Sequence, residues 1–285
     1  MQGFQGKKVF ITGGSSGIGR ATAVELARSG ASVYVAARGQ EQLDETLGLM
    51  RDAAASADQV LGMVSVDVTD RAAVRAAVAQ VLEGLGGLDV LIANTGYART
   101  GYVQDLPDEV FDDLMKTNYL GHVNVVRALL PHFIERGAGH LCLVSSMLGF
   151  MSMPSYAAYS ASKYAILGFA EGLRCELAHR GVGVSVFYPP TTRTPGLDAE
   201  NESKPREVWA MESESMFSKV YDADQVATEL LKFIRSGRFE AVMGWMNVLI
   251  LFLVRHFPRL ARYLNDDEYR KALRKAEAHK DQAAG

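Results

Sequence analysis

The chain has 285 residues, of which 48% are hydrophobic, and its net charge at pH 7 is −3. This composition is ample for a large core, and an α/β chain of this length commonly folds as one domain. The lack of a basic excess argues against nucleic acid as a partner. Two cysteines are too few for a disulfide framework and fit a reducing compartment, and residues 1–8 lack the apolar core of a signal peptide.

Short apolar runs alternate with segments of helical periodicity along most of the chain. Continuous Val/Ile/Leu runs are typical of buried parallel strands, which we predict at Lys8–Thr12, Ser32–Ala37, Leu61–Val66, Val90–Ala93, His140–Ser145, Gly183–Tyr188 and Glu240–Met243. The helices expected between them span 17–29, 41–56, 70–83, 107–136, 155–180 and 222–236. The alternation predicts a Rossmann-type, doubly wound, mostly seven-stranded parallel sheet with helices on both faces. Ligand is then expected at the carboxyl ends of the strands.

The first predicted strand leads into the glycine-rich stretch Thr12–Gly19 and then into a predicted helix. Glycines let the backbone turn sharply and approach a pyrophosphate, while the helix N-terminus offers free N–H groups and a positive dipole. In this strand-turn-helix context, the stretch predicts a dinucleotide site rather than an ordinary Gly-rich turn.

Tyr159 and Lys163 lie four residues apart in a predicted helix, so their side chains share one face. An ammonium one turn away favours the phenolate, so we expect Lys163 to lower the tyrosine pKa from its usual value of about 10. Such a tyrosine can exchange a proton with a carbonyl or alcohol oxygen. Ser146 lies thirteen residues before Tyr159, at the end of an apolar run.

Together these motifs resemble the short-chain dehydrogenase/reductase family over about the first 240 residues. The matching positions are Thr12–Gly19, Asn94–Gly96, Asn118, Ser146, Tyr159 and Lys163. The resemblance implies that Tyr159 gives a proton to the carbonyl oxygen as hydride arrives from the nicotinamide, while Ser146 holds that oxygen. It also implies that Lys163 binds the nicotinamide ribose and that Asn118 helps to hold a water linked to it. A local hydrogen bond within its own helix is the alternative for Asn118.

The resemblance further implies that a nicotinamide dinucleotide is bound by Gly13, Ser15, Ser16, Gly17, Ile18, Gly19, Arg38, Asp67, Asn94, Gly96, Tyr159, Lys163, Pro189, Thr192 and Thr194. Ala37 stands where NAD-binding members usually carry an acidic residue, and Arg38 follows it. Because a guanidinium forks onto phosphate oxygens, we predict NADPH/NADP+ as the cofactor. The alternatives are a solvated loop arginine at position 38 and a turn cap at Asp67. No metal site is predicted.

The segment from Tyr188 to Pro205 contains both family features and departures from the family pattern. Pro190 stands where most members have glycine, and Thr192 stands where Val or Ile is frequent, which weakens the expected carboxamide contact. Residues 190–217 are polar, so we expect a mobile substrate loop there.

Tyr188–Gly196 and Glu200–Pro205 are also similar to 3-ketodihydrosphingosine reductases, a subgroup that works at membranes. This similarity implies NADPH-dependent reduction of the ketone of a long-chain sphingoid base. The alternatives are a reductase or dehydrogenase for another apolar carbonyl or alcohol, such as a steroid, retinoid or fatty ketone, and a non-catalytic nucleotide-binding scaffold.

Residues 244–285 follow the predicted catalytic domain, residues 1–243, as an apolar and basic helical extension. The uncharged run 241–254 has fourteen residues, fewer than the roughly twenty that a bilayer span needs. The basic residues after it alternate with apolar ones, which suits a surface of anionic lipid. We therefore expect peripheral contact through 245–263 at the cytoplasmic face of a membrane. A subunit interface and a wall over the substrate pocket are the alternatives, and a homodimer or homotetramer is expected.

Overall fold

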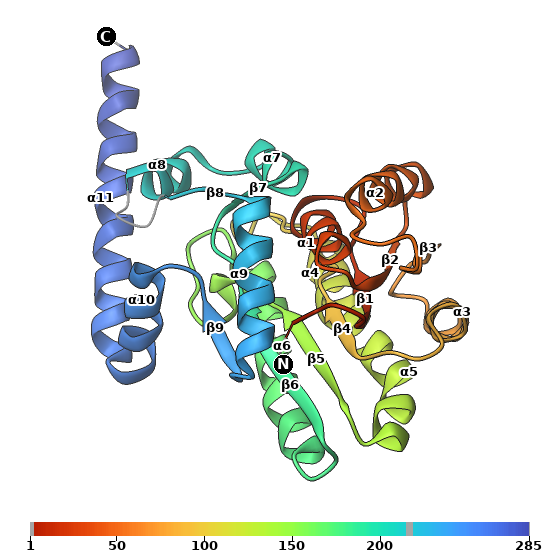
Figure 1. Cartoon of the computed structure of the whole chain (residues 1–285). Helices are drawn as coiled ribbons and strands as arrows, with labels where there is room; N and C mark the ends of the chain where they lie inside the picture. The colour runs from red at the N-terminus through yellow and green to blue at the C-terminus, as the bar shows by residue number, and fades with distance from the viewer. Residues whose placement is uncertain (1–2, 215–218, 285) are drawn as a thin grey trace.

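A single parallel sheet forms the centre of the computed structural model, which describes residues 3–214 and 219–284 (Figure 1). The last part of the predicted substrate loop, residues 215–217, lies outside the described residues, as do residues 1, 2, 218 and 285. The sheet contains β1 (Lys8–Thr12), β2 (Ser32–Ala37), β3 (Leu61–Ser65), β4 (Val90–Ala93), β5 (Gly139–Val144), β6 (Val182–Tyr188) and β9 (Glu240–Val242). Their order is β3-β2-β1-β4-β5-β6-β9, and each pairing is parallel. The predicted sheet is confirmed, with strand ends within one residue of expectation.

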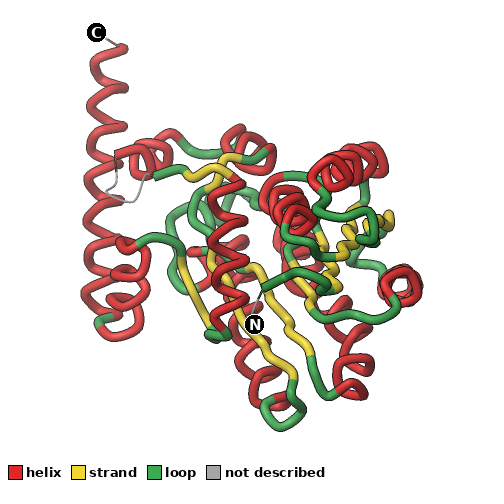
Figure 2. Tube along the Cα trace, in the orientation of Figure 1, coloured by secondary structure: helices red, strands yellow, loops and turns green. Residues whose placement is uncertain are grey.

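Helices cover both faces of this sheet (Figure 2). One face carries α1 (Gly17–Arg28), α2 (Gln40–Ala53) and α9 (Ala223–Ser236), and the other carries α3 (Arg71–Leu85), α5 (Gly121–Arg136) and α6 (Ala157–Leu177). Successive strand residues point to opposite faces. In β1, Val9 and Ile11 therefore join the hydrophobic cluster of the first face, whereas Phe10 joins that of the second. This two-sided burial explains the continuous apolar runs.

The long helix predicted at 107–136 is interrupted in the structure. It begins as α4 (Asp108–Leu114), passes through a π-helical segment at Met115–Leu120, and continues as α5. Such single π turns are rare in proteins, and those that occur often lie at functional sites. The segment contains Asn118, one of the predicted site residues.

The described part of the predicted substrate loop, 190–214, is mostly helical rather than irregular. These residues form β7 (Thr192–Arg193), α7 (Pro195–Glu202) and α8 (Arg206–Glu214), and β7 pairs with β8 (Tyr221–Asp222). Thr194 caps α7 because its Oγ1 accepts a hydrogen bond of 3.2 Å from the Leu197 N–H. Pro195 occupies the first turn, where its missing N–H costs nothing. The Thr-Pro pair was thus a helix-start signal in the sequence.

Two helices form the C-terminal extension, α10 (Trp245–His256) and α11 (Pro258–Ala284), beside the sheet edge at β9 (Figure 1). The predicted apolar helix followed by a basic one is confirmed. Ile250 of α10 belongs to the buried core, and α11 packs against α8. None of the helices in the described ranges combines the length and the hydropathy needed to cross a membrane.

Candidate active site

A cavity of about 1100 Å³ lies at the carboxyl ends of the strands. Loops that follow β1, β2, β4, β5 and β6 contribute to its lining, because parallel strands place their carboxyl ends at the same edge. The lining includes the predicted residues Gly13, Ser15, Ser16, Gly17, Ile18, Arg38, Asp67, Asn94, Gly96, Ser146, Tyr159, Lys163, Pro189, Thr192 and Thr194. Gly19 and Asn118 lie behind this lining.

The glycine loop is packed too tightly to accept side chains. A Cβ on Gly19 would lie 2.1 Å from the carbonyl oxygen of Gly13, and a Cβ on Gly13 would lie 2.9 Å from the Cα of Thr95. Gly13 also has a φ of 67°, in the left-handed region that favours glycine. Asn94 fixes the loop, since its Nδ2 donates to the Gly13 carbonyl at 3.1 Å. The cradle therefore fits a pyrophosphate at the N-terminus of α1.

Two predicted residues lie at the β2 and β3 end of the cavity. Arg38 is exposed, and its guanidinium makes no hydrogen bond or ion pair with any residue that the structure describes. Asp67 accepts a hydrogen bond of 2.9 Å from the Thr69 N–H, so the turn role considered for it is present. The cap of α3 is Asp70, which accepts from the Ala72 and Ala73 N–H groups. Asp67 still lines the cavity and is available to a ligand.

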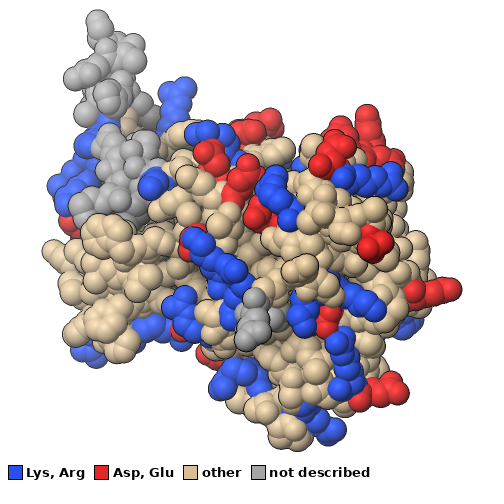
Figure 3. Space-filling model, in the orientation of Figure 1, with Lys and Arg blue, Asp and Glu red and all other residues tan. Residues whose placement is uncertain are grey.

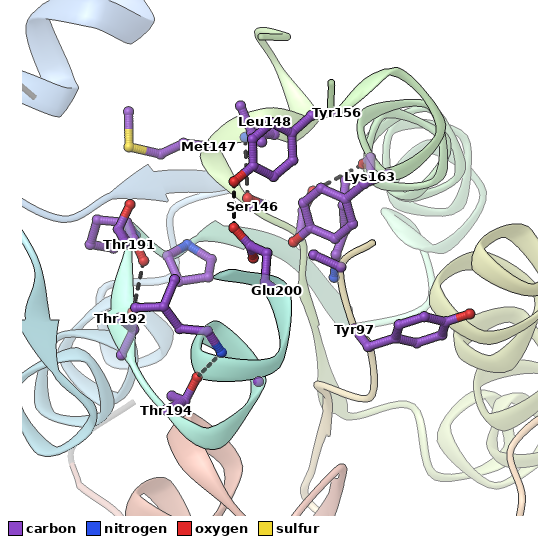
Figure 4. Close-up of a pocket in the computed structure, with 18 of the residues that line it drawn as sticks. Tyr97, Ser146, Met147, Leu148, Tyr156, Lys163, Thr191, Thr192, Thr194 and Glu200 are labelled. Carbon is purple, nitrogen blue, oxygen red and sulfur yellow. Dashed lines mark hydrogen bonds between the residues drawn. The ribbon is translucent and has the colours of Figure 1, made fainter. Parts of the chain in front are cut away.

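Ser146, Tyr159 and Lys163 all line the cavity. Figure 4 shows Ser146 and Lys163 among the residues that line it. The Lys163 Nζ lies 5.8 Å from the centroid of the Tyr159 ring and donates to the Val144 carbonyl at 3.3 Å. The Oγ of Ser146 accepts the Leu148 N–H at 3.2 Å, and the Ser146 side chain also hydrogen-bonds with Tyr159. The three side chains therefore lie together in the lining of one cavity.

The expectation that Lys163 lowers the Tyr159 pKa is wrong for this structure. Burial raises the pKa of the Tyr159 phenol above its usual value, and the hydrogen bond with Ser146 offsets only part of this effect. Burial also lowers the pKa of Lys163 to about 8. Because both groups lie in the interior, loss of hydration dominates both titrations. Tyr159 consequently keeps its proton at neutral pH, as a proton donor must.

Asn118 is fully buried and connects three parts of the chain. Its Oδ1 accepts the Tyr97 N–H at 3.0 Å, and its Nδ2 donates to the Tyr97 carbonyl and to the Ser162 Oγ, both at 2.9 Å. The alternative of a hydrogen bond within its own helix is therefore wrong. A Cβ on Gly96 would lie 3.0 Å from the Lys163 Nζ and 3.1 Å from the Asn118 Oδ1. Glycine at this position keeps the surroundings of the lysine open.

Sequence reasoning missed a polar cluster where α7 and α8 line the cavity, formed by Tyr156, Glu200, Lys204 and Glu212. The Tyr156 hydroxyl is hydrogen-bonded to Glu200 (Figure 4) and shares its one proton with Glu212. Lys204 forms ion pairs with both carboxylates. One sequence signal was present, because Glu200 and Lys204 are spaced i, i+4.

The cavity beyond Ser146 is lined by apolar side chains from several elements. They include Met147, Met151, Met153, Trp209, Met211, Ile250, Leu253, Val254 and Leu264. One face of α10 and α11 thus lines the cavity, which agrees with the wall considered as an alternative for the C-terminal extension. This end of the cavity is suited to an alkyl chain.

The chain is similar to several known proteins. The family model for short chain dehydrogenase matches residues 7–205. The 3-ketodihydrosphingosine reductase of Bos taurus is 37% identical over 84% of this chain and 71% of its own length. The 3-ketodihydrosphingosine reductase of Dictyostelium discoideum is 30% identical, covering 95% of this chain and 90% of the relative. A crystal structure of levodione reductase superposes with a TM-score of 0.74 at 24% identity, covering 84% of this chain and 95% of that one.

Proposed function

Because this chain belongs to the short chain dehydrogenase family, we propose that it reduces 3-ketodihydrosphingosine to dihydrosphingosine with NADPH. The family consists of oxidoreductases that use nicotinamide cofactors, and the relatives from Bos taurus and Dictyostelium discoideum carry the corresponding name. The observation that carries the proposal is the position of Ser146, Tyr159 and Lys163. They lie where the glycine cradle meets a cavity end that is apolar enough for a long alkyl chain.

In the proposed reaction the bound nicotinamide supplies the hydride. The protonated Tyr159 phenol donates its proton to the ketone oxygen, and the Ser146 hydroxyl donates a hydrogen bond to the same oxygen as negative charge develops there. Lys163 binds the nicotinamide ribose, while Asn118 holds the surrounding backbone in place through Tyr97. The cradle from Gly13 to Gly19 holds the pyrophosphate.

The proposal is tested by following NADPH absorbance with purified protein and 3-ketodihydrosphingosine in detergent micelles. We expect saturable NADPH oxidation that depends on the ketone. NADPH binding without oxidation would exclude this substrate while leaving the family assignment intact. A steroid or a fatty ketone would then be the next substrate to assay.

We also propose peripheral membrane contact through the C-terminal extension. Its exposed apolar residues, here called the C-terminal apolar surface, are Trp245, Val248, Leu249, Phe252, Phe257, Leu260, Tyr263 and Leu264. The left edge of the molecule in Figure 3, over α10 and the lower part of α11, is largely free of charge and has basic side chains at its border. Exposed Arg259 and Arg262 lie among these apolar residues, which favours anionic lipid as the occupant. Both cysteines are free, which suits the cytoplasmic face of a membrane.

The double variant Trp245→Ser with Phe252→Ser tests this surface without removing core residues. Each side chain loses apolar area that would be buried in the bilayer, so we expect binding to phosphatidylserine vesicles to weaken by about tenfold or more. Leu49→Ser is the control, because Leu49 is an exposed apolar residue on α2. Equal vesicle binding by the double variant and wild type contradicts membrane contact. If the double variant instead dissociates a dimer, the surface is a subunit interface.

A further inference from the structure

The polar cluster between α7, α8 and Tyr156 already holds one ammonium group inside the cavity. The Lys204 side chain is only 1% exposed, and its Nζ forms ion pairs with Glu200, at 3.2 Å, and with Glu212. The Nζ also lies 5.7 Å from the centroid of the Tyr156 ring and 5.4 Å from that of Trp209. Carboxylates and aromatic faces together are the chemistry that recognises a cation.

One of the two carboxylate oxygens of Glu200 is available to a ligand. Its Oε1 accepts from Tyr156 and pairs with Lys204, whereas its Oε2 makes no hydrogen bond or ion pair with the residues that the structure describes. The residue lines the cavity, and its side chain is 17% exposed. A partly buried carboxylate oxygen at a ligand cavity is a strong acceptor for a charged donor.

This carboxylate lies beside the reacting centre. Tyr156, to which Glu200 is hydrogen-bonded, has its ring centroid 6.3 Å from that of Tyr159. The negative charge of Glu200 acts on Tyr159. Burial is the main cause of the raised pKa of that phenol, and the Glu200 charge adds to it. A cation bound by Glu200 would therefore lie close to an oxygen atom held by Tyr159.

We propose that Glu200 binds the ammonium group of an amino ketone whose nitrogen is on the carbon next to the carbonyl, and so selects such ketones over simple ones. The inference rests on the proposed function, because 3-ketodihydrosphingosine is a 2-amino ketone. In this ketone the carbon that carries the ammonium is bonded to the carbonyl carbon, so the group that binds the ammonium must lie beside the group that binds the carbonyl oxygen. The alkyl chain extends toward the apolar lining from α10 and α11.

A first test needs no variant. The wild-type kcat/KM for 3-ketodihydrosphingosine is compared with that for the same 1-hydroxy-3-ketone lacking the amino group, in identical micelles. One charge-assisted hydrogen bond corresponds to a preference of about 10- to 100-fold for the amino ketone. Equal values for the two ketones overturn the inference and leave the reductase proposal in place. If neither ketone is reduced, the proposed function itself fails.

The second test is Glu200→Gln, which keeps the side-chain size and the acceptor for Tyr156. Lys204 keeps Glu212 as an ionic partner, so α7 and α8 remain attached. We expect the preference for the amino ketone to fall by about tenfold or more through the loss of the charged acceptor. Glu202→Gln is the matched control, because Glu202 is an exposed carboxylate at the end of α7. If the cluster only attaches these helices, Glu200→Gln lowers both rates equally and the preference stays unchanged.

Discussion

Replacing Tyr159 by Phe is expected to lower kcat for ketone reduction by about 10²- to 10⁴-fold, the usual contribution of a positioned proton donor. The ring still fills its half-buried place, so NADPH binding and the melting temperature should stay close to wild type. The loss should be confined to catalysis because the phenol oxygen carries the transferred proton. NADPH oxidation and the quenching of NADPH fluorescence on binding measure the two properties separately.

Tyr164→Phe is the matched control for this variant. Tyr164 lies on the same helix, α6, and is 42% exposed outside the cavity, so its hydroxyl is expected to contribute nothing to turnover. A Tyr159→Phe protein with kcat within about tenfold of wild type would contradict the acid role. The proton would then come from another group or from water.

Most of the fold could be predicted from the sequence, because the signals for strands and helices are local and repeat along the chain. Apolar runs such as Val9–Ile11 determined the strands, and strand alternation placed the ligand edge. The Gly13 carbonyl is held by Asn94, about eighty residues later in the chain. No periodicity in the sequence would have revealed such a pairing.

The pKa shifts and the polar cluster could not be predicted from the sequence, because they depend on burial and on contacts between residues far apart in the chain. The spacing of Tyr159 and Lys163 indicated that the two side chains are close together, but not how far they are removed from water. This loss of hydration decides the direction of both pKa shifts. Glu212 and Tyr156 meet only because α8 folds over the cavity, 56 residues after Tyr156. The polar composition of residues 190–217 had suggested a loop. In the structure, the buried ion pairs of Lys204 with Glu200 and Glu212 hold α7 and α8 together.

Replacing Arg38 by Asp is expected to raise the KM for NADPH by about 10- to 100-fold, the equivalent of one or two charge-assisted hydrogen bonds. The guanidinium is exposed at the cavity end next to β2 and makes no hydrogen bond or ion pair among the described residues, so the substitution removes no structural contact. The new carboxylate repels a 2′-phosphate but can accept hydrogen bonds from the ribose hydroxyls of NADH. The KM for NADH should therefore stay level or fall.

The ratio of kcat/KM for the two cofactors is the deciding measurement, because it cancels any general loss of active protein. Arg51→Asp supplies the same change in net charge from an exposed position on α2 that does not line the cavity, and it should leave the ratio unchanged. An Arg38→Asp protein that keeps the wild-type ratio would mean that this guanidinium points into solvent when the cofactor binds. Selectivity for the 2′-phosphate would then have to come from another donor, such as the Ser15 or Ser16 hydroxyl in the glycine loop, which also lines the cavity.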